Sequence, residues 1–218
     1  MENFISKIKN NISESFYVKG GFFVDFFDWH DIENITNNYV YSNYIDLVDK
    51  QNRKVNPDRH NIPWVGPTKD VNQIAEMVNQ GCSFIITAMS KYNHGCNYIC
   101  SMLDKELSAE SDIHVYGGLH EDSKSFPIHS DQPHNLIIQV QGICEWTVFK
   151  DTSWKPENLH SDEGLTEDFK IIAEEGDVIY IPSLVLHRCI PNSQRLSFSI
   201  PFTVNNNRPL RRWNTLNE

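Results

Sequence analysis

The second half of the chain is built from short runs of β-branched and aromatic residues, separated by glycine, proline, asparagine and aspartate. Such runs are typical of β-strands, and the turn-forming residues mark where each strand ends. We expect strands at 113–116, 136–140, 145–149, 177–182 and 195–200. Many short strands at close spacing fold into a sandwich or a barrel. The pattern therefore predicts a mainly β protein.

The first half mixes helical and extended patterns. Apolar residues recur at helical spacing over 71–78, and Gly81 follows as a stop signal. A buried strand is expected at 83–87 and a second helix at 97–107. We expect one domain over 1–218, made of a helical and mixed flank (1–112), a barrel core (113–204) and a tail (205–218). The polar stretch 151–175 is predicted to be an insertion in the barrel.

Composition excludes several classes of protein. The formal net charge of −10 over 218 residues disfavours nucleic acid as a partner, because phosphates repel an acidic surface. The apolar runs are far shorter than the roughly 20 residues that a membrane helix needs. Five scattered cysteines, an odd number, do not form a disulfide framework. The first residues contain no apolar region of signal-peptide type, so we expect a cytoplasmic protein.

Three residues are candidate metal ligands. His129 and Asp131 are two apart, so in an extended segment their side chains project from the same face. His187 ends a strongly apolar run that begins after a glycine turn at Gly176. Two histidines and one carboxylate form a facial triad that leaves other positions on the ion open, as in non-haem Fe(II) oxygenases. Each motif alone is weak, but the two together favour a metal site.

The order of these motifs resembles that of the cupin barrels. The second cupin motif has the form G-x5-P-x-G-x2-H, and Gly176, Pro182 and His187 match it, with Leu184 where the second glycine would be. Within that class, residues 115–200 resemble the JmjC-type oxygenases, nearest to the ribosomal-oxygenase-like branch. The residues that carry the resemblance are Tyr116, His129, Asp131, Gln139, Gly142, Trp146, Gly176, Asp177, Tyr180, Pro182 and His187.

The resemblance implies a double-stranded β-helix (cupin or jelly-roll) barrel with N-terminal flanking helices. It also implies that His129, Asp131 and His187 bind Fe(II), with 2-oxoglutarate as cosubstrate and hydroxylation as the reaction. Tyr116 is a candidate for hydrogen bonding the cosubstrate, and Asn135 for lining the pocket beside the metal. For Tyr116 the alternative is a core aromatic, and for Asn135 a turn residue. Trp146 is expected to be a packing residue. Trp154 is expected to be a lid residue.

The sequence departs from the family pattern at two positions. Cys144 stands where members carry the lysine that binds the distal carboxylate of 2-oxoglutarate, and a thiol cannot form that charge-assisted pair. His114 replaces an asparagine that helps to hold the cosubstrate. Both changes remove contacts that the family uses for 2-oxoglutarate.

Three interpretations of the missing lysine remain open. In the first, Arg195 is the anchor, and strand alternation places Ser197 and Ser199 beside it on the pocket face. In the second, Lys124 or His134 binds the cosubstrate, or the cosubstrate is not 2-oxoglutarate. In the third, Arg195 is a surface residue and the chemistry has been lost.

The favoured hypothesis is an Fe(II)- and 2-oxoglutarate-dependent dioxygenase that hydroxylates an amino-acid side chain in a peptide or protein, or a small metabolite. The alternatives are a non-catalytic cupin that binds a metal or ligand, and a cupin dioxygenase that does not use 2-oxoglutarate. The sequence leaves the substrate, the hydroxylated atom and the oligomeric state open.

Overall fold

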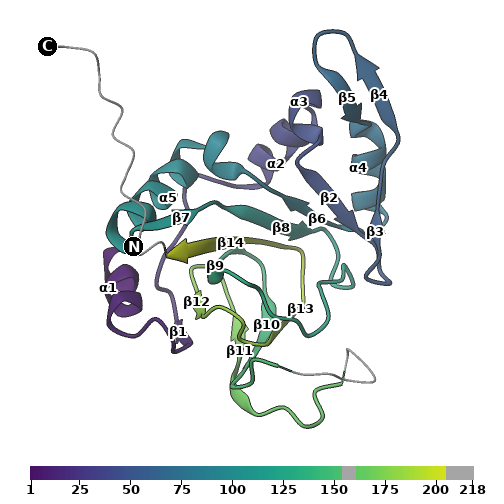
Figure 1. The fold of residues 1–218 in the computed structure, drawn as a ribbon. Coiled ribbons are helices and arrows are strands. Elements are labelled where there is room, and N and C mark those ends of the chain that lie inside the picture. Colours follow the sequence, from purple (N-terminus) through teal and green to yellow (C-terminus); the bar gives the residue numbers. More distant parts are fainter. Residues whose placement is uncertain (154–160, 205–218) are drawn as a thin grey trace, which may run out of the picture.

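A computed structural model describes residues 1–153 and 161–204 (Figure 1). The nine-stranded sheet is antiparallel, and its strands run in the order β1-β12-β9-β14-β8-β6-β2-β3, with β7 pairing to β14. A three-stranded sheet has the order β11-β10-β13, and β4 and β5 form a separate hairpin. The strands are β1 (Phe16–Val18), β2 (Ile45–Val48), β3 (Lys54–Val55), β4 (Arg59–Ile62), β5 (Gly66–Lys69), β6 (Ser83–Ile86), β7 (Ala109–Ser111), β8 (His114–Gly118), β9 (His134–Gln141), β10 (Cys144–Phe149), β11 (Glu167–Ala173), β12 (Val178–Ile181), β13 (His187–Pro191) and β14 (Arg195–Val204).

The large sheet buries both of its faces, and strand alternation decides which residues go to each face. Leu136, Ile138 and Val140 of β9 pack in the main core with the helices. Ile137, between them, packs in a second core with Trp146 of the small sheet. The two sheets therefore face each other as the halves of a barrel, as expected from the resemblance.

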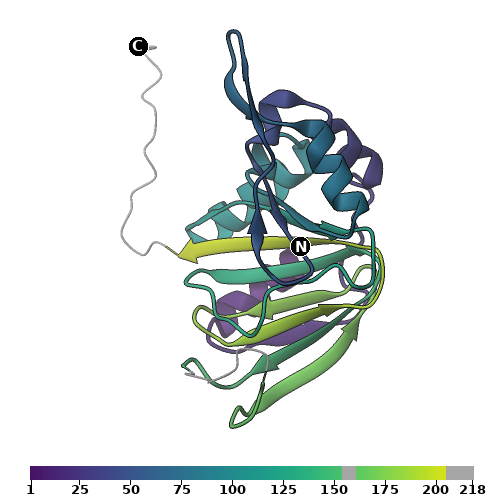
Figure 2. The same cartoon turned by 90° about the vertical axis from the view of Figure 1, so that its right-hand side faces the viewer.

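Helices cover the outer face of the large sheet (Figure 2). They are α1 (Glu2–Asn10), α2 (Trp29–Thr36), α3 (Tyr39–Ser42), α4 (Val71–Asn79), α5 (His94–Leu107) and the 3-10 turn η1 (Met89–Lys91). The side chain of Asp70 caps α4, and Gly81 follows it with a positive φ of 101°. Helix α5 begins three residues before the predicted start, because Asn93 caps it by accepting from the Cys96 amide.

The segment 151–175 is not simply an insertion. It contains β11, which pairs with β10 as the edge of the small sheet. Phe169 and Ile171 pack against the second core, while Asp168 and Lys170, which alternate with them, are exposed. One face of this strand is exposed, which explains the polar composition of the segment. The other face is packed against the core, which stabilises the strand. The prediction of a simple insertion was therefore wrong for residues 167–173.

The first 112 residues do more than flank the barrel. β1 extends the large sheet at one edge by pairing with β12, and β6, β2 and β3 extend it beyond β8. The hairpin β4–β5 projects from one end of the molecule (Figures 1 and 2). Within residues 1–153 and 161–204, no helix combines the length and apolar character that crossing a membrane requires. The predicted tail, 205–218, lies outside the described residues, as does Trp154.

Candidate metal centre

His129, Asp131 and His187 converge at one end of the space between the two sheets. One ligand atom from each lies within 4.8 Å of the others. The His129 Nε2 is 3.9 Å from Asp131 Oδ1, and the His187 Nε2 is 3.5 Å from Asp131 Oδ2. These separations leave room for one ion held by two nitrogens and one oxygen, the donor set of the facial triad.

The backbone positions these ligands. His129 and His187 form an isolated antiparallel bridge, and the Leu184 amide donates to the Asp131 carbonyl at 2.8 Å. The segment around His129 is extended, as predicted, but it does not form a longer strand. Pro127 and Pro133 lie on either side of it, and proline supplies no backbone donor for a strand ladder.

Both histidines present Nε2 to the centre, on the side of the Asp131 carboxylate. Nδ1 of His129 is 2.8 Å from the Pro127 carbonyl, and Nδ1 of His187 is 3.0 Å from the Val185 carbonyl. A carbonyl only accepts, so in each ring Nδ1 is the donor and Nε2 is the nitrogen that faces the centre. Burial, with the neighbouring His129, lowers the pKa of His187 to about 4. The imidazole of His187 is therefore neutral near pH 7.

A chain of hydrogen bonds orients the Asp131 carboxylate. The amide nitrogen of Asn135 donates to Asp131 Oδ2 at 3.1 Å, and the Ser199 hydroxyl donates to Asn135 Oδ1 at 2.8 Å. Asn135 lines the cavity, as the sequence suggested, but its amide group is used to hold a metal ligand. Such supporting contacts fix the geometry of a metal site.

A cavity leads inward from the three ligands. The other residues that line it are Tyr116, Ser125, Phe126, Asn135, Ile137, Trp146, Cys189, Arg195, Ser197, Phe198 and Ser199. Arg195, Ser197 and Ser199 share one face of β14, as strand alternation predicted. Burial raises the pKa of Tyr116 to about 12, so its phenol stays protonated and able to donate. The hydroxyl of Ser197 donates to Gln139 at 2.8 Å.

Arg195 is a buried cation in the wall of this cavity. Its side chain is only 2% exposed, and its NH1 donates to the Ser123 carbonyl at 3.2 Å. Within the described part of the chain, no carboxylate lies within ion-pairing distance of it. The interpretation of Arg195 as a surface residue is therefore wrong.

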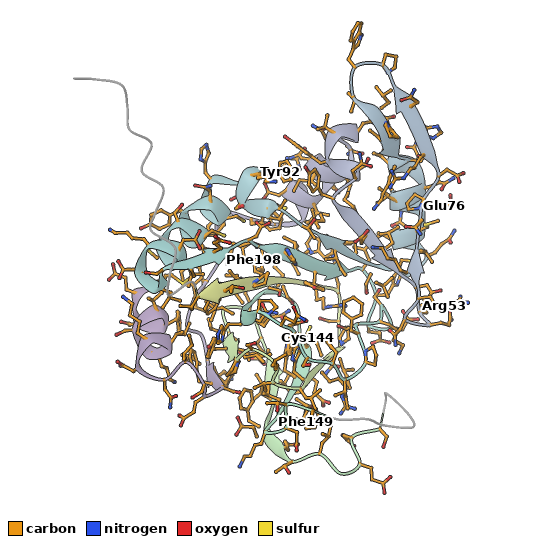
Figure 3. The ribbon with its side chains drawn as sticks, viewed as in Figure 1. Arg53, Glu76, Tyr92, Cys144, Phe149 and Phe198 are labelled. Carbon is orange, nitrogen blue, oxygen red and sulfur yellow. The ribbon has the colours of Figure 1, made fainter. Side chains whose placement is uncertain are left out.

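Cys144 lies inside the barrel, as Figure 3 shows, whereas Arg53 is at the outer surface. A hydrogen bond from the Cys189 thiol lowers the pKa of Cys144, and the nearby Arg195 guanidinium adds to this effect. The positive charge of Arg195 thus lies beside the position where the family carries its lysine. Cys144 lies on β10 of the small sheet and Arg195 on β14 of the large sheet, so the two side chains approach each other from opposite sheets.

The other candidate anchors are not in the cavity wall. His134 packs against both Tyr180 and Phe202, and the Ser183 amide donates to its Nδ1 at 3.2 Å. Lys124 is exposed and lines a neighbouring depression instead. The interpretation in which His134 or Lys124 replaces the lysine therefore has no geometric support.

Some cavity residues were missed by the sequence analysis. Ser125, Phe126 and Cys189 line the wall, and Trp146, expected only to pack, does so too. Ser125 and Phe126 precede His129 in a loop, where no periodicity marks the buried positions. Their proximity to the His129 motif was the only available signal.

The fold and the three ligands together define the class: a barrel of two facing antiparallel sheets with a two-histidine, one-carboxylate metal centre. The chain belongs to the JmjC domain family, since the family model for the JmjC domain matches residues 91–210. This confirms the resemblance drawn from the motifs.

Similar proteins are known by sequence and by structure. The bifunctional lysine-specific demethylase and histidyl-hydroxylase NO66 of Dictyostelium discoideum is 22% identical over 204 residues, which cover 90% of this chain and 37% of that protein. The same enzyme of Drosophila grimshawi is 24% identical over 188 residues, covering 82% and 25%. The chain therefore spans well under half the length of these relatives.

Solved structures share the fold. A structure of ycfD from E. coli has a TM-score of 0.64 at 18% identity and covers 92% of this chain and 53% of that one. A second, titled as YcfD, a ribosomal oxygenase from Escherichia coli in complex with cobalt and 2-oxoglutarate, has a TM-score of 0.64 at 16% identity, covering 92% and 52%. At this identity the likeness establishes the fold alone, and this chain spans about half of each.

Proposed function

We propose that this protein is an Fe(II)- and 2-oxoglutarate-dependent oxygenase that hydroxylates an amino-acid side chain in a peptide or protein. His129, Asp131 and His187 hold the metal, and Arg195 binds the distal carboxylate of the cosubstrate. The observation that carries this proposal is a buried guanidinium, without a carboxylate partner among the described residues, in the same cavity as a complete facial triad.

The buried charge of Arg195 favours an anionic ligand in the cavity. Removing a charge from water is costly unless an opposite charge compensates for it. Arg195 has one carbonyl partner and no carboxylate partner within the described residues. A dicarboxylate bound between the metal and Arg195 supplies the missing charge. A guanidinium also matches a carboxylate with two parallel hydrogen bonds, so it is a suitable replacement for lysine.

The residues present fit the metal and the cosubstrate. Two imidazoles and a carboxylate suit Fe(II) and leave positions open for a chelating 2-oxo acid. Tyr116 and Ser197 line the same cavity, and the protonated Tyr116 hydroxyl can donate a hydrogen bond to a bound acid. When bound, iron and 2-oxoglutarate activate dioxygen for insertion of one oxygen atom into a C–H bond of the substrate.

The openness of the centre supports a large substrate. About one third of the His129 and Asp131 side chains is exposed, at 34% and 35%, whereas the Arg195 end is closed. A side chain on a peptide can reach such a metal from outside. The names of the relatives, a histidyl-hydroxylase and a ribosomal oxygenase, agree with this class. A small metabolite is the alternative substrate. A cytoplasmic location is also part of the proposal, supported by five cysteines that are all free thiols.

Anaerobic titration with Fe(II) and 2-oxoglutarate tests the proposal. Chelation by both gives a visible charge-transfer band, which should form in the wild type and in Cys144→Ala. In Arg195→Met the apparent Kd for 2-oxoglutarate should rise by roughly 100-fold, because the loss of a charge-assisted pair is worth about 2–3 kcal/mol. Arg53→Met, which changes an exposed arginine, is the matched control.

Succinate release separates the alternatives. The proposed enzyme releases succinate in air when iron and 2-oxoglutarate are present, and Asp131→Ala abolishes this release. If Fe(II) binds but 2-oxoglutarate produces no charge-transfer band, the result favours the alternative of a cupin dioxygenase that does not use 2-oxoglutarate. If the charge-transfer band forms but no peptide in a panel leads to release of succinate, the protein is a non-catalytic cupin. Equal 2-oxoglutarate affinity in Arg195→Met and the wild type excludes Arg195 as the anchor.

A further inference from the structure

Trp146 carries a buried polar atom without a partner. Its side chain is 8% exposed, and within the described residues its indole nitrogen Nε1 has no hydrogen-bond partner. A buried tryptophan N–H usually finds an acceptor, and groups left without one call for an explanation. Because Trp146 lines the cavity, a ligand in that cavity is the natural acceptor.

The position of the ring points to which ligand this is. The indole is stacked on the imidazole of His187, with ring centroids 6.2 Å apart and planes at 28°. Cys144 lies two residues earlier on β10 and therefore on the same face, and it is close to Arg195. Trp146 thus stands between the metal end of the cavity and the Arg195 end.

We infer that the Trp146 indole N–H donates a hydrogen bond to a carboxylate oxygen of the dicarboxylate bound between the metal and Arg195. This inference rests on the proposed function and adds a binding residue to it. The indole N–H is a donor only, so it selects a ligand atom that accepts a hydrogen bond. Its ring is fixed by stacking and by the sheet, so the donor is oriented before the ligand arrives.

The inference also assigns a function to the β10 face. On β10, Cys144 stands where the resemblance places a lysine, and Trp146, two residues later, presents a donor to the cavity. Arg195 then supplies the charge from the opposite sheet, and Trp146 supplies a neutral, directional contact from β10. A bound acid is held from both halves of the barrel.

Nuclear magnetic resonance of the zinc-loaded protein tests this directly. Zn(II) is diamagnetic and does not turn over, so the complex with 2-oxoglutarate is stable. The chain has five tryptophans, and the indole N–H signal of Trp146 is assigned from its own backbone in the wild type. On addition of 2-oxoglutarate this signal should move downfield and its exchange with water should slow, whereas the Trp29 signal should not.

Calorimetry provides the second readout. Trp146→Phe keeps the ring and removes the donor, so 2-oxoglutarate should bind the zinc-loaded variant about tenfold more weakly, or about 1.4 kcal/mol. Its affinity for Zn(II) alone should stay the same. Trp29→Phe, which changes a tryptophan that packs on Phe84 outside the cavity, is the matched control and should bind normally.

The outcomes distinguish this inference from the proposed function. If the zinc-loaded wild type does not bind 2-oxoglutarate, the proposed function fails. If it binds and the Trp146 signal does not move, the inference alone is overturned, even where Trp146→Phe fails to fold. Equal affinity of a folded Trp146→Phe variant and the wild type overturns it as well.

Discussion

His129 and His187 exchange both of their backbone hydrogen bonds, at 3.1 and 2.9 Å, although they are far apart in the sequence. Their imidazole rings leave this bridge on the same side, with centroids 4.4 Å apart. The backbone thus fixes the positions of two candidate metal ligands. Preorganisation of this kind lowers the entropic cost of binding an ion.

The first prediction concerns the metal itself. Wild-type protein should be stabilised by Mn(II), by about 2.7 kcal/mol at a concentration of 100 times the Kd. Asp131→Ala should lose this stabilisation, because two imidazoles alone do not complete the triad. Thermal unfolding with and without Mn(II) measures the difference. Asp122→Ala, in an exposed loop, should respond like the wild type. If Mn(II) stabilised Asp131→Ala as much as the wild type, the Asp131 carboxylate would not be a metal ligand.

A second prediction tests the support of Asp131. Asn135→Ala removes the hydrogen bond that orients this carboxylate, and loss of such a contact typically weakens metal binding by about 10- to 100-fold. Ser197→Ala, which alters the same wall without touching Asp131, should leave the Mn(II) affinity unchanged. Competition between Mn(II) and a calibrated chelator gives both values. Equal losses in the two variants would argue for a general loosening of the wall.

A third prediction exploits the proximity of Cys144 and Arg195. Cys144→Lys alone should lower stability by about 3 kcal/mol or more, because it buries a second positive charge beside the first. Arg195→Ser should lose 2-oxoglutarate binding, and the double variant should recover it, since the lysine then occupies the anchor position of the family. Calorimetric titration of the zinc-loaded variants checks this. A double variant that folds and still binds no 2-oxoglutarate would contradict the shared position.

A fourth prediction concerns Leu184, which has a φ of 66° and a side chain that is 49% exposed. A left-handed backbone costs a non-glycine residue about 1–2 kcal/mol, and part of this is offset by the greater freedom of glycine when unfolded. Leu184→Gly should therefore raise the free energy of unfolding by about 0.5–1 kcal/mol in urea. Gly176→Ala, at a φ of 85° with the Phe23 ring 2.7 Å from the added carbon, should lower it. A destabilised Leu184→Gly would mean that the leucine side chain contributes packing.

A fifth prediction concerns the buried carboxylate of Asp177, which is 1% exposed. It accepts hydrogen bonds from the Tyr17 hydroxyl at 2.9 Å, the Gly20 amide at 2.7 Å and the Glu174 amide at 2.9 Å. Asp177→Ala should cost about 3 kcal/mol or more, because hydrogen bonds to a charged group contribute about 1.5–3 kcal/mol each and do not add fully. Urea unfolding measures this loss, with exposed Asp168→Ala as control. Hydrogen exchange should show that residues 16–20 open first.

Much of the barrel could be predicted because its strands are locally distinctive. The run at 136–140 is rich in β-branched apolar residues, the run at 195–200 alternates polar and apolar residues, and both became central strands of the large sheet. The convergence of the metal ligands followed from two spacing motifs. The orientation of Arg195 into the cavity followed from alternation along its strand. These features depend on residues within a few positions of one another.

What the sequence did not reveal depends on distant partners. Asp177 matched a family motif, but its partner Tyr17 lies 160 positions away and no local pattern connects them. Strand β11 was taken for part of an insertion, because its charged outer face outweighs Phe169 and Ile171 in composition. Trp146 was assigned to packing, since an unpartnered indole nitrogen becomes visible only when its surroundings are known.

The pairing of β1 with β12 has a practical consequence. Residues 1–18 complete the large sheet from outside: β1 covers what would otherwise be an open edge, and Lys9 reaches Glu106 of α5 at 2.8 Å. Without this arm, β12 would offer unpaired backbone groups to any extended peptide, including the same arm of another copy. Such an exchange would make dimers by swapping, so an affinity tag placed before Met1 should be tested for its effect on self-association.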